Sequence, residues 1–238
     1  MADIARFKAI RPIRDKVHLV ATRPYYSYKK NVLKAKLQDN PYTFLRIINP
    51  EFNSPVKTKA NSDRRFKLVS QRYHEFIEKN ILIQDQQAKL YLYRQSKGEK
   101  SSVGVIGGAS VKEYLNDDIK RHEATLTSRE EIFTRYLDIV GYNAEPVLIS
   151  YKGNSDINSF ISDLVGSRPE YEFSTTDLIK HELWILEDDE ADKFEQLLSQ
   201  MGITVLHHQL GYLKVEKTNL LMPDIFYPIL LSKTSFKF

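Results

Sequence analysis

Segments with the pattern of β-strands alternate with segments typical of amphipathic helices along most of the chain, and this alternation constrains the fold most. The clearest helix begins at Ser62, because apolar residues then recur at steps of three and four and share one helix face. The predicted strands are 5–12, 42–48, 82–84, 89–94, 103–110, 146–151 and 179–186. The predicted helices are 27–40, 62–77, 128–140, 156–165 and one that begins at 187, and 111–115 is predicted as a helix or a turn.

This order of elements favours a mixed α/β protein, with a mixed sheet and flanking helices. The runs 82–84 and 89–94 are predicted to pair as a hairpin, which argues against a purely parallel sheet. Gly104, Gly107 and Gly108 fall within one predicted strand, where glycines indicate close backbone packing or a bulge. We find no internal repeat and no low-complexity linker.

The composition is that of a globular protein, with 42% hydrophobic and 28% charged residues in a chain of 238. The absence of cysteine excludes disulfides, thiolate zinc sites, iron–sulfur clusters and a cysteine nucleophile. The first residues lack the apolar run of a signal peptide, and no stretch approaches the roughly 18 apolar residues of a membrane helix. We therefore expect a soluble, cytoplasmic protein without a membrane partner.

The total charge gives little support for a nucleic-acid partner. Lys and Arg number 35 and Asp and Glu number 31, so the formal net charge is +4, half of it within residues 199–238. We recognise no basic block of the kind that follows a phosphate backbone. A local anion site made by a few arginines is the expectation instead.

No dinucleotide-binding, P-loop, zincin or nucleophile-elbow motif occurs in the chain. The most suggestive local cluster is His122-Glu123, followed by Thr125 and Arg129. A histidine beside a carboxylate can move a proton, and a nearby arginine can hold a phosphate or carboxylate. Adjacent residues point to opposite faces of a strand, however, so a purely structural role stays open.

Three other arginines are candidate ligand-binding residues. Arg23 and Tyr25 belong to a proline-containing loop that suits an anionic or ring-bearing ligand, although a packed turn is the equal alternative. Arg46 and Arg94 lie in predicted strands, where solvent-facing arginines are the commoner outcome. His181, in an alternating apolar context, is interpreted as structural, and we expect no metal site.

Seven motifs, taken in order, resemble those of domain-of-unknown-function family 1015. The resemblance covers roughly residues 5–186, and the motifs are 7–12, 20–25, 40–50, 90–95, 119–125, 143–146 and 181–184. The family is largely uncharacterised and is often described as related to ParB-type partitioning proteins. Its best-known signature, Ala-Asp-Gly-His-His-Arg, resembles the phosphate-binding motif of ParB and sulfiredoxin.

The resemblance implies an α/β enzyme that binds a nucleotide or a small phosphorylated metabolite and transfers or removes phosphate on a serine-like hydroxyl. ATP or ADP with magnesium is the cofactor it implies. His122 and Glu123 would then assist proton transfer, and the ligand-binding residues would be Arg23, Tyr25, Arg46, Arg94, Thr125 and Arg129. The alternative is a ParB-like, non-catalytic nucleic-acid-binding or regulatory module.

The family signature is absent where it should follow the last helix. If the codon register of 198–205 is moved back by one base, allowed codons turn residues 199–205 into Ile-Ala-Asp-Gly-His-His-Arg. We therefore expect that a frameshift interrupts the coding sequence. In that interpretation residues 1–198 are the N-terminal part of the family domain, 199–238 are an out-of-frame tail, and the chain lacks the phosphate-binding loop and its activity.

Overall fold

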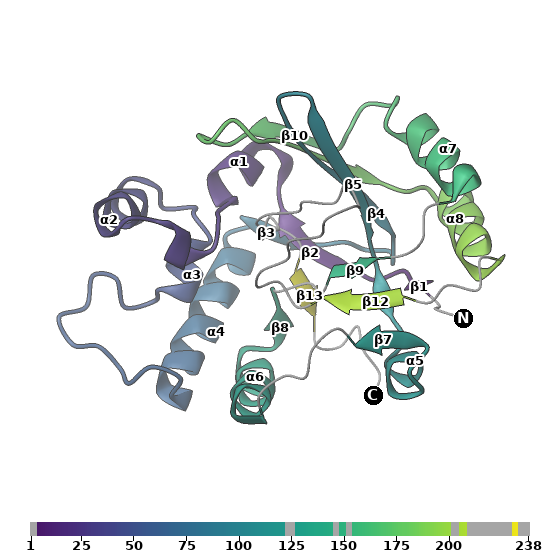
Figure 1. The fold of residues 1–238 in the computed structure, drawn as a ribbon. Helices are drawn as coiled ribbons and strands as arrows, with labels where there is room; N and C mark the ends of the chain where they lie inside the picture. Colours follow the sequence, from purple (N-terminus) through teal and green to yellow (C-terminus); the bar gives the residue numbers. More distant parts are fainter. Residues whose placement is uncertain are drawn as a thin grey trace.

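The computed structural model describes residues 4–121, 127–144, 148–150, 154–200, 205–208 and 230–232, and these form a mixed α/β fold (Figure 1). The strands are β1 (Ile4–Ala5), β2 (Ala9–Pro12), β3 (Leu82–Gln84), β4 (Tyr91–Lys97), β5 (Lys100–Ile106), β6 (Gly108–Ala109), β7 (Ile119–Arg121), β8 (Tyr142–Asn143), β9 (Leu148–Ser150), β10 (Tyr171–Ser174), β11 (Lys180–Ile185), β12 (Val205–His208) and β13 (Leu230–Ser232). The helices are α1 (Val17–Val20), α2 (Lys30–Asp39), α3 (Leu45–Ile48), α4 (Asp63–Glu78), α5 (Val111–Leu115), α6 (Thr127–Val140), α7 (Ser155–Leu164) and α8 (Asp188–Gln200).

An antiparallel sheet of order β10-β11-β4-β5 carries two hydrophobic layers, one on each face. Helices α7 and α8 cover one face (Figure 1), where their buried apolar residues meet alternate residues of β4 and β11. The N-terminal segment and α1 cover the other face, against the intervening residues. Two-residue alternation along β4 therefore divides the core, with Leu92 on the α7–α8 side and Tyr91 and Tyr93 on the other.

A second core lies between α3, α4 and α6 and the sheet of order β3-β2-β13-β8. The helix predicted from Ser62 is confirmed as α4, and Ser62 is its N-cap because its side chain accepts a hydrogen bond from the Arg65 backbone N–H. Gly141 follows α6 with φ +82°, the left-handed conformation in which a glycine commonly ends a helix. The remaining strands form the pair β1-β6 and the mixed sheet β7-β12-β9.

The strand predicted over 42–48 is wrong, because its second half is helix α3. Phe44, Leu45 and Ile47 are all buried, a set that one strand face cannot provide but that a short helix in the core can. Asn49 closes the helix, since its side-chain amide donates to the Leu45 carbonyl oxygen at 3.0 Å. β-Branched and aromatic content alone therefore misled the prediction.

The predicted hairpin of 82–84 and 89–94 is also wrong, although both segments contain strands. β3 pairs with β2, whereas β4 pairs with β5 through a turn at Lys97 and Gly98, which has φ +58°. The strand predicted over 103–110 is interrupted at Gly107, where a Cβ would lie 2.6 Å from Ile4 Cγ2. Close packing against Ile4 therefore explains the glycine at position 107. Strands β7 and β10 were not predicted from the sequence.

Candidate functional site

Part of the predicted catalytic cluster cannot be placed. His122, Glu123 and Thr125 lie outside the residues that the structure describes. Arg129 is exposed in the first turn of α6. Among the described residues, no group of three or more His, Asp or Glu side chains could hold a metal ion. No helix in the described ranges has the length and apolar character needed to cross a membrane.

Arg23 already holds a protein carboxylate. Its Nη1 lies 3.3 Å from Oδ2 of Asp177, and its guanidinium lies over the ring of Tyr28 at 4.9 Å from the centroid. The Tyr28 hydroxyl accepts a hydrogen bond from the Arg23 backbone N–H at 2.9 Å. The loop is therefore a packed turn, but it leaves the ring of Tyr25 exposed to solvent.

Arg46 and Arg94 also have internal partners. Arg46 lies in α3 and donates to two backbone carbonyl oxygens, those of Asn40 at 3.1 Å and Gln38 at 3.2 Å. Arg94 makes two hydrogen bonds to Glu182, at 2.6 and 2.8 Å, and these hold the pKa of that buried carboxyl below its usual value. The three candidate arginines bind different partners in these contacts. The described part of the chain therefore does not bring them together in one site.

His181 is buried and structural, in agreement with the sequence interpretation. Its Nδ1 lies 2.7 Å from the Tyr93 hydroxyl, its Nε2 lies 3.3 Å from Oγ1 of Thr175, and the ring of Phe173 stacks on it at 5.0 Å. Burial lowers the pKa of His181 to about 4, only partly opposed by the charge of Asp177. This imidazole is therefore neutral at physiological pH.

The arrangement best suited to a ligand is a pocket between α2, the loop after α3 and the first turn of α4. Its volume is about 350 Å³, within the range of small-molecule sites. We call it the basic pocket. Its lining consists of the cations Lys30, Lys34, Lys57 and Arg65, the carboxylate Glu51, and Leu33, Leu37, Asn49 and Phe52.

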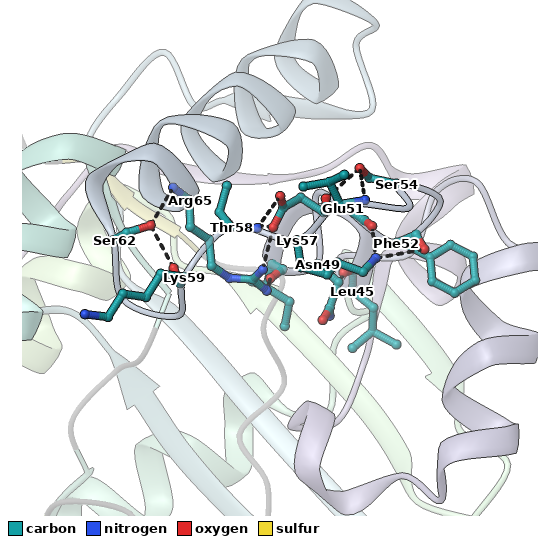
Figure 2. A network of polar contacts seen from close by, with 12 residues as sticks. Leu45, Asn49, Glu51, Phe52, Ser54, Lys57, Thr58, Lys59, Ser62 and Arg65 are labelled. Atoms are coloured by element: carbon teal, nitrogen blue, oxygen red, sulfur yellow. Dashed lines mark hydrogen bonds and ion pairs between the residues drawn. The ribbon is translucent and has the colours of Figure 1, made fainter.

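Glu51 fixes one wall of the basic pocket. Figure 2 shows this buried carboxylate accepting hydrogen bonds from the Thr58 backbone N–H at 2.8 Å, the Thr58 hydroxyl at 2.7 Å and Arg65 Nη1 at 2.9 Å. These bonds, the one from the Thr58 hydroxyl foremost, lower the pKa of Glu51. Lys57 Nζ donates to the carbonyl oxygens of Glu51 and Phe52 and so ties the loop to itself, whereas the bond from Arg65 to Glu51 ties the loop to α4.

The basic pocket keeps a surplus of positive charge. Glu51 is its only carboxylate and is already bound by Arg65, whereas Lys30 and Lys34 are exposed and form no ion pair with any residue that the structure describes. Leu33 and Leu37 supply an apolar wall beside these ammonium groups. Such a surface can bind an anion and can also contact the organic part of the ligand.

The pocket belongs to a segment with a strong local charge excess. Residues 23–67 contain eleven Lys and Arg and only three Asp and Glu, so the remaining residues contain 24 and 28 and are net negative. The whole-chain charge of +4 is the sum of these two opposite contributions, so it hides the local excess. Sequence reasoning missed the pocket because it tested the tail and the total charge, whereas a local count would have found the segment.

A second cavity, of about 380 Å³, lies beside α1 and β10 and is less suited to an anion. Its two arginines, Arg14 and Arg168, are matched by two glutamates, Glu170 and Glu172. Arg14 already lies 3.8 Å from Glu170, and its Nη2 donates to a backbone carbonyl oxygen. Of these two cavities, only the basic pocket therefore has cations that no described carboxylate neutralises.

Comparison with known proteins gives one match. The model of a family described as "Protein of unknown function (DUF1015)" matches residues 4–207. Neither a curated protein nor a solved structure matches the chain.

Proposed function

Because the chain belongs to the DUF1015 family, we propose that it binds a phosphorylated small metabolite or nucleotide in the basic pocket. The observation that supports this proposal is the lining of four cations against one carboxylate that Thr58 and Arg65 already satisfy. Phosphate oxygens accept charge-assisted hydrogen bonds from lysine and arginine. We place the phosphate here rather than at Arg23, Arg46 or Arg94, because those three hold protein groups.

The proposed activity of the intact protein is transfer or removal of a phosphoryl group at a serine-like hydroxyl. In that reaction the lysines would hold the phosphate and offset the charge that develops on its oxygens. His122 and Glu123 would carry the proton transfer, as the family resemblance implies. The magnesium that this resemblance also implies does not fit the described lining of the pocket, because its single carboxylate, Glu51, already accepts three hydrogen bonds and the other charged lining groups are cations.

The binding proposal is tested by calorimetric titration with inorganic phosphate, ribose 5-phosphate and phosphoserine at low ionic strength. We expect the double variant Lys30→Gln/Lys34→Gln to bind the phosphorylated probes about tenfold more weakly or worse, because two charge-assisted hydrogen bonds are lost. The matched control is Lys8→Gln/Lys100→Gln, which removes the same charge from exposed lysines outside the pocket. Equal losses in both double variants, or no phosphate binding at all, would refute the proposal.

The competing proposal is a ParB-like nucleic-acid-binding or regulatory module without catalysis. A thermal-shift comparison separates the two classes. Stabilisation by DNA and by none of the phosphorylated metabolites would favour the competing proposal. Unchanged turnover in His122→Ala and Glu123→Ala, measured in the protein translated from the restored reading frame, would remove both residues from the catalytic assignment.

We also propose that residues 199–238 are translated out of frame. The support is the codon argument, in which a one-base change produces the Ala-Asp-Gly-His-His-Arg signature of the family. Strands β12 and β13 lie in this segment and would have different residues in the restored frame. Sequencing the gene decides the matter: an uninterrupted gene in which no one-base change opens a longer frame would exclude the frameshift, and a restored frame should bind phosphate more tightly.

A further inference from the structure

We infer that the ligand of the basic pocket is a free nucleotide, whose base stacks on one of the exposed rings of Tyr25 and Tyr26 and meets the other at its edge, while its phosphates enter the pocket. This inference rests on the proposed function, because it uses the same anion site. It goes further by naming the chemical class of the ligand and a second binding surface. That surface, Tyr25 and Tyr26, is called the aromatic pair below.

The aromatic pair offers ring faces to solvent. Tyr25 is 57% exposed and Tyr26 is 73% exposed, and their rings meet edge to face with centroids 5.9 Å apart. An aromatic side chain beside cationic groups is the usual platform for a nucleic-acid base, because every base has a flat face that can stack on it. The two rings therefore provide a recognition element that phosphate or a sugar phosphate alone would not use.

The pair is held in place by Pro24 and Tyr28. Backbone and side-chain groups of Ser27 both donate to the Pro24 carbonyl oxygen, at 2.9 and 2.7 Å, and close a 3₁₀ turn over Tyr25–Ser27. Tyr28 is anchored through its hydroxyl to the loop and through its ring to Arg23 and Lys36. The turn that presents the aromatic pair is thus fixed on both sides, which reduces the entropy lost on binding.

The pair is also close enough to the pocket for one ligand to reach both. Only three residues lie between Tyr26 and Lys30, so their Cα atoms are at most about 14 Å apart. Lys30 is the first residue of α2 and lines the pocket, and Lys34 follows one helical turn later. An extended nucleotide has comparable length, with the base at one end and the phosphates at the other.

The charges favour a nucleotide over a phosphorylated amino acid. Phosphoserine carries an ammonium group that needs an anionic partner, but among the described lining residues the single carboxylate, Glu51, is bound by Thr58 and Arg65. From Arg23 to Gln38 the chain has five cations and no Asp or Glu. A ligand with several negative charges and no positive one matches this surface.

The test compares AMP with ribose 5-phosphate, which carries the same phosphate and sugar but no base, by calorimetric titration of the full chain. We expect AMP to bind about tenfold more tightly, since stacking of one base on aromatic rings is a substantial contribution to binding. In Tyr25→Leu/Tyr26→Leu the affinity for AMP should fall to that for ribose 5-phosphate, which should itself be unchanged. Phe133→Leu, which removes an exposed ring on α6, is the control and should keep the difference.

Equal affinities for AMP and ribose 5-phosphate in the unmodified protein would overturn the inference, and so would an AMP preference that survives loss of both tyrosines. A short single-stranded oligoadenylate that binds more tightly per nucleotide than AMP would also overturn it, by assigning the surface to a polymer. These failures remain distinct from failure of the proposed function. That proposal is tested separately, by the loss of ribose 5-phosphate binding in Lys30→Gln/Lys34→Gln compared with its control double variant.

Discussion

Replacement of Arg11 by methionine is expected to lower the free energy of unfolding by about 3–5 kcal/mol, the usual cost of leaving one partner of a buried ion pair alone. Arg11 lies in β2, and its side chain is 11% exposed. Its Nε donates to both carboxylate oxygens of Asp85, at 2.9 and 3.0 Å. Its Nη1 donates to Glu170 at 3.1 Å and to the Tyr171 hydroxyl at 2.6 Å.

These bonds join two sheets, since Arg11 and Asp85 belong to the β2–β3 edge and Tyr171 to β10. The Tyr171 hydroxyl also donates to the carbonyl oxygen of Pro12, and the Tyr91 hydroxyl donates to Asp85 at 2.6 Å. Burial alone would lower the pKa of Arg11, but its hydrogen bonds with Asp85 and Tyr171 raise it overall. Without the guanidinium, the largely buried carboxylate of Asp85 would keep a single side-chain partner among the described residues, the Tyr91 hydroxyl.

Urea unfolding monitored by circular dichroism measures this loss. Arg14→Met is the matched control, because Arg14 lies three residues away, contacts the same Glu170 at 3.8 Å, and is 52% exposed. We expect the control to change stability by no more than about 0.5 kcal/mol. Similar small effects for both variants would show that the Arg11 network does not contribute to stability.

Arg11 also illustrates which parts of the fold could be predicted from the sequence. The N-cap of α4 was predictable because Ser62 and the residues it caps are neighbours in the chain. The partners of Arg11 are 74 and 159 or more residues away, and nothing in the local pattern indicates them. The hairpin error has the same cause, since β3 finds its partner in the distant β2 rather than in the next strand.

The candidate site was predicted less well than the fold. Sequence reasoning selected Arg23, Arg46 and Arg94 because arginines bind anions, but each of them has an internal partner that only the three-dimensional arrangement reveals. The lysines of α2 drew no attention, because a basic helix is usually a solvated surface. Their significance comes from the loop around Glu51, which folds against α4 and forms the opposite wall of the pocket that these lysines line.

The second large effect that we expect is a loss of folding stability at acidic pH, caused by the protonation of His181. Burial lowers the pKa of this imidazole to about 4, whereas the ordinary value of 6.5 applies to the unfolded chain. The unfolded state therefore binds the proton more tightly, so the stability contributed by neutral His181 is complete above about pH 6.5 and is lost as the pH falls toward 4. Across the whole interval the loss amounts to about 3 kcal/mol, at 1.36 kcal/mol for each unit of pKa difference.

The measurement is the free energy of unfolding of the unmodified protein and of His181→Gln at several pH values between about 7.5 and 4.5. Glutamine can still hydrogen bond to the Tyr93 hydroxyl but cannot be protonated. Carboxylates titrate in both proteins, so the difference between the two curves isolates His181. We expect the free energy of unfolding of the unmodified protein to fall by about 2.5 kcal/mol relative to that of His181→Gln between the two ends of this pH range. His74→Gln, at an exposed position of α4, controls for the removal of a histidine. Parallel curves for the unmodified protein and His181→Gln would mean that the buried imidazole does not set the acid sensitivity of the fold.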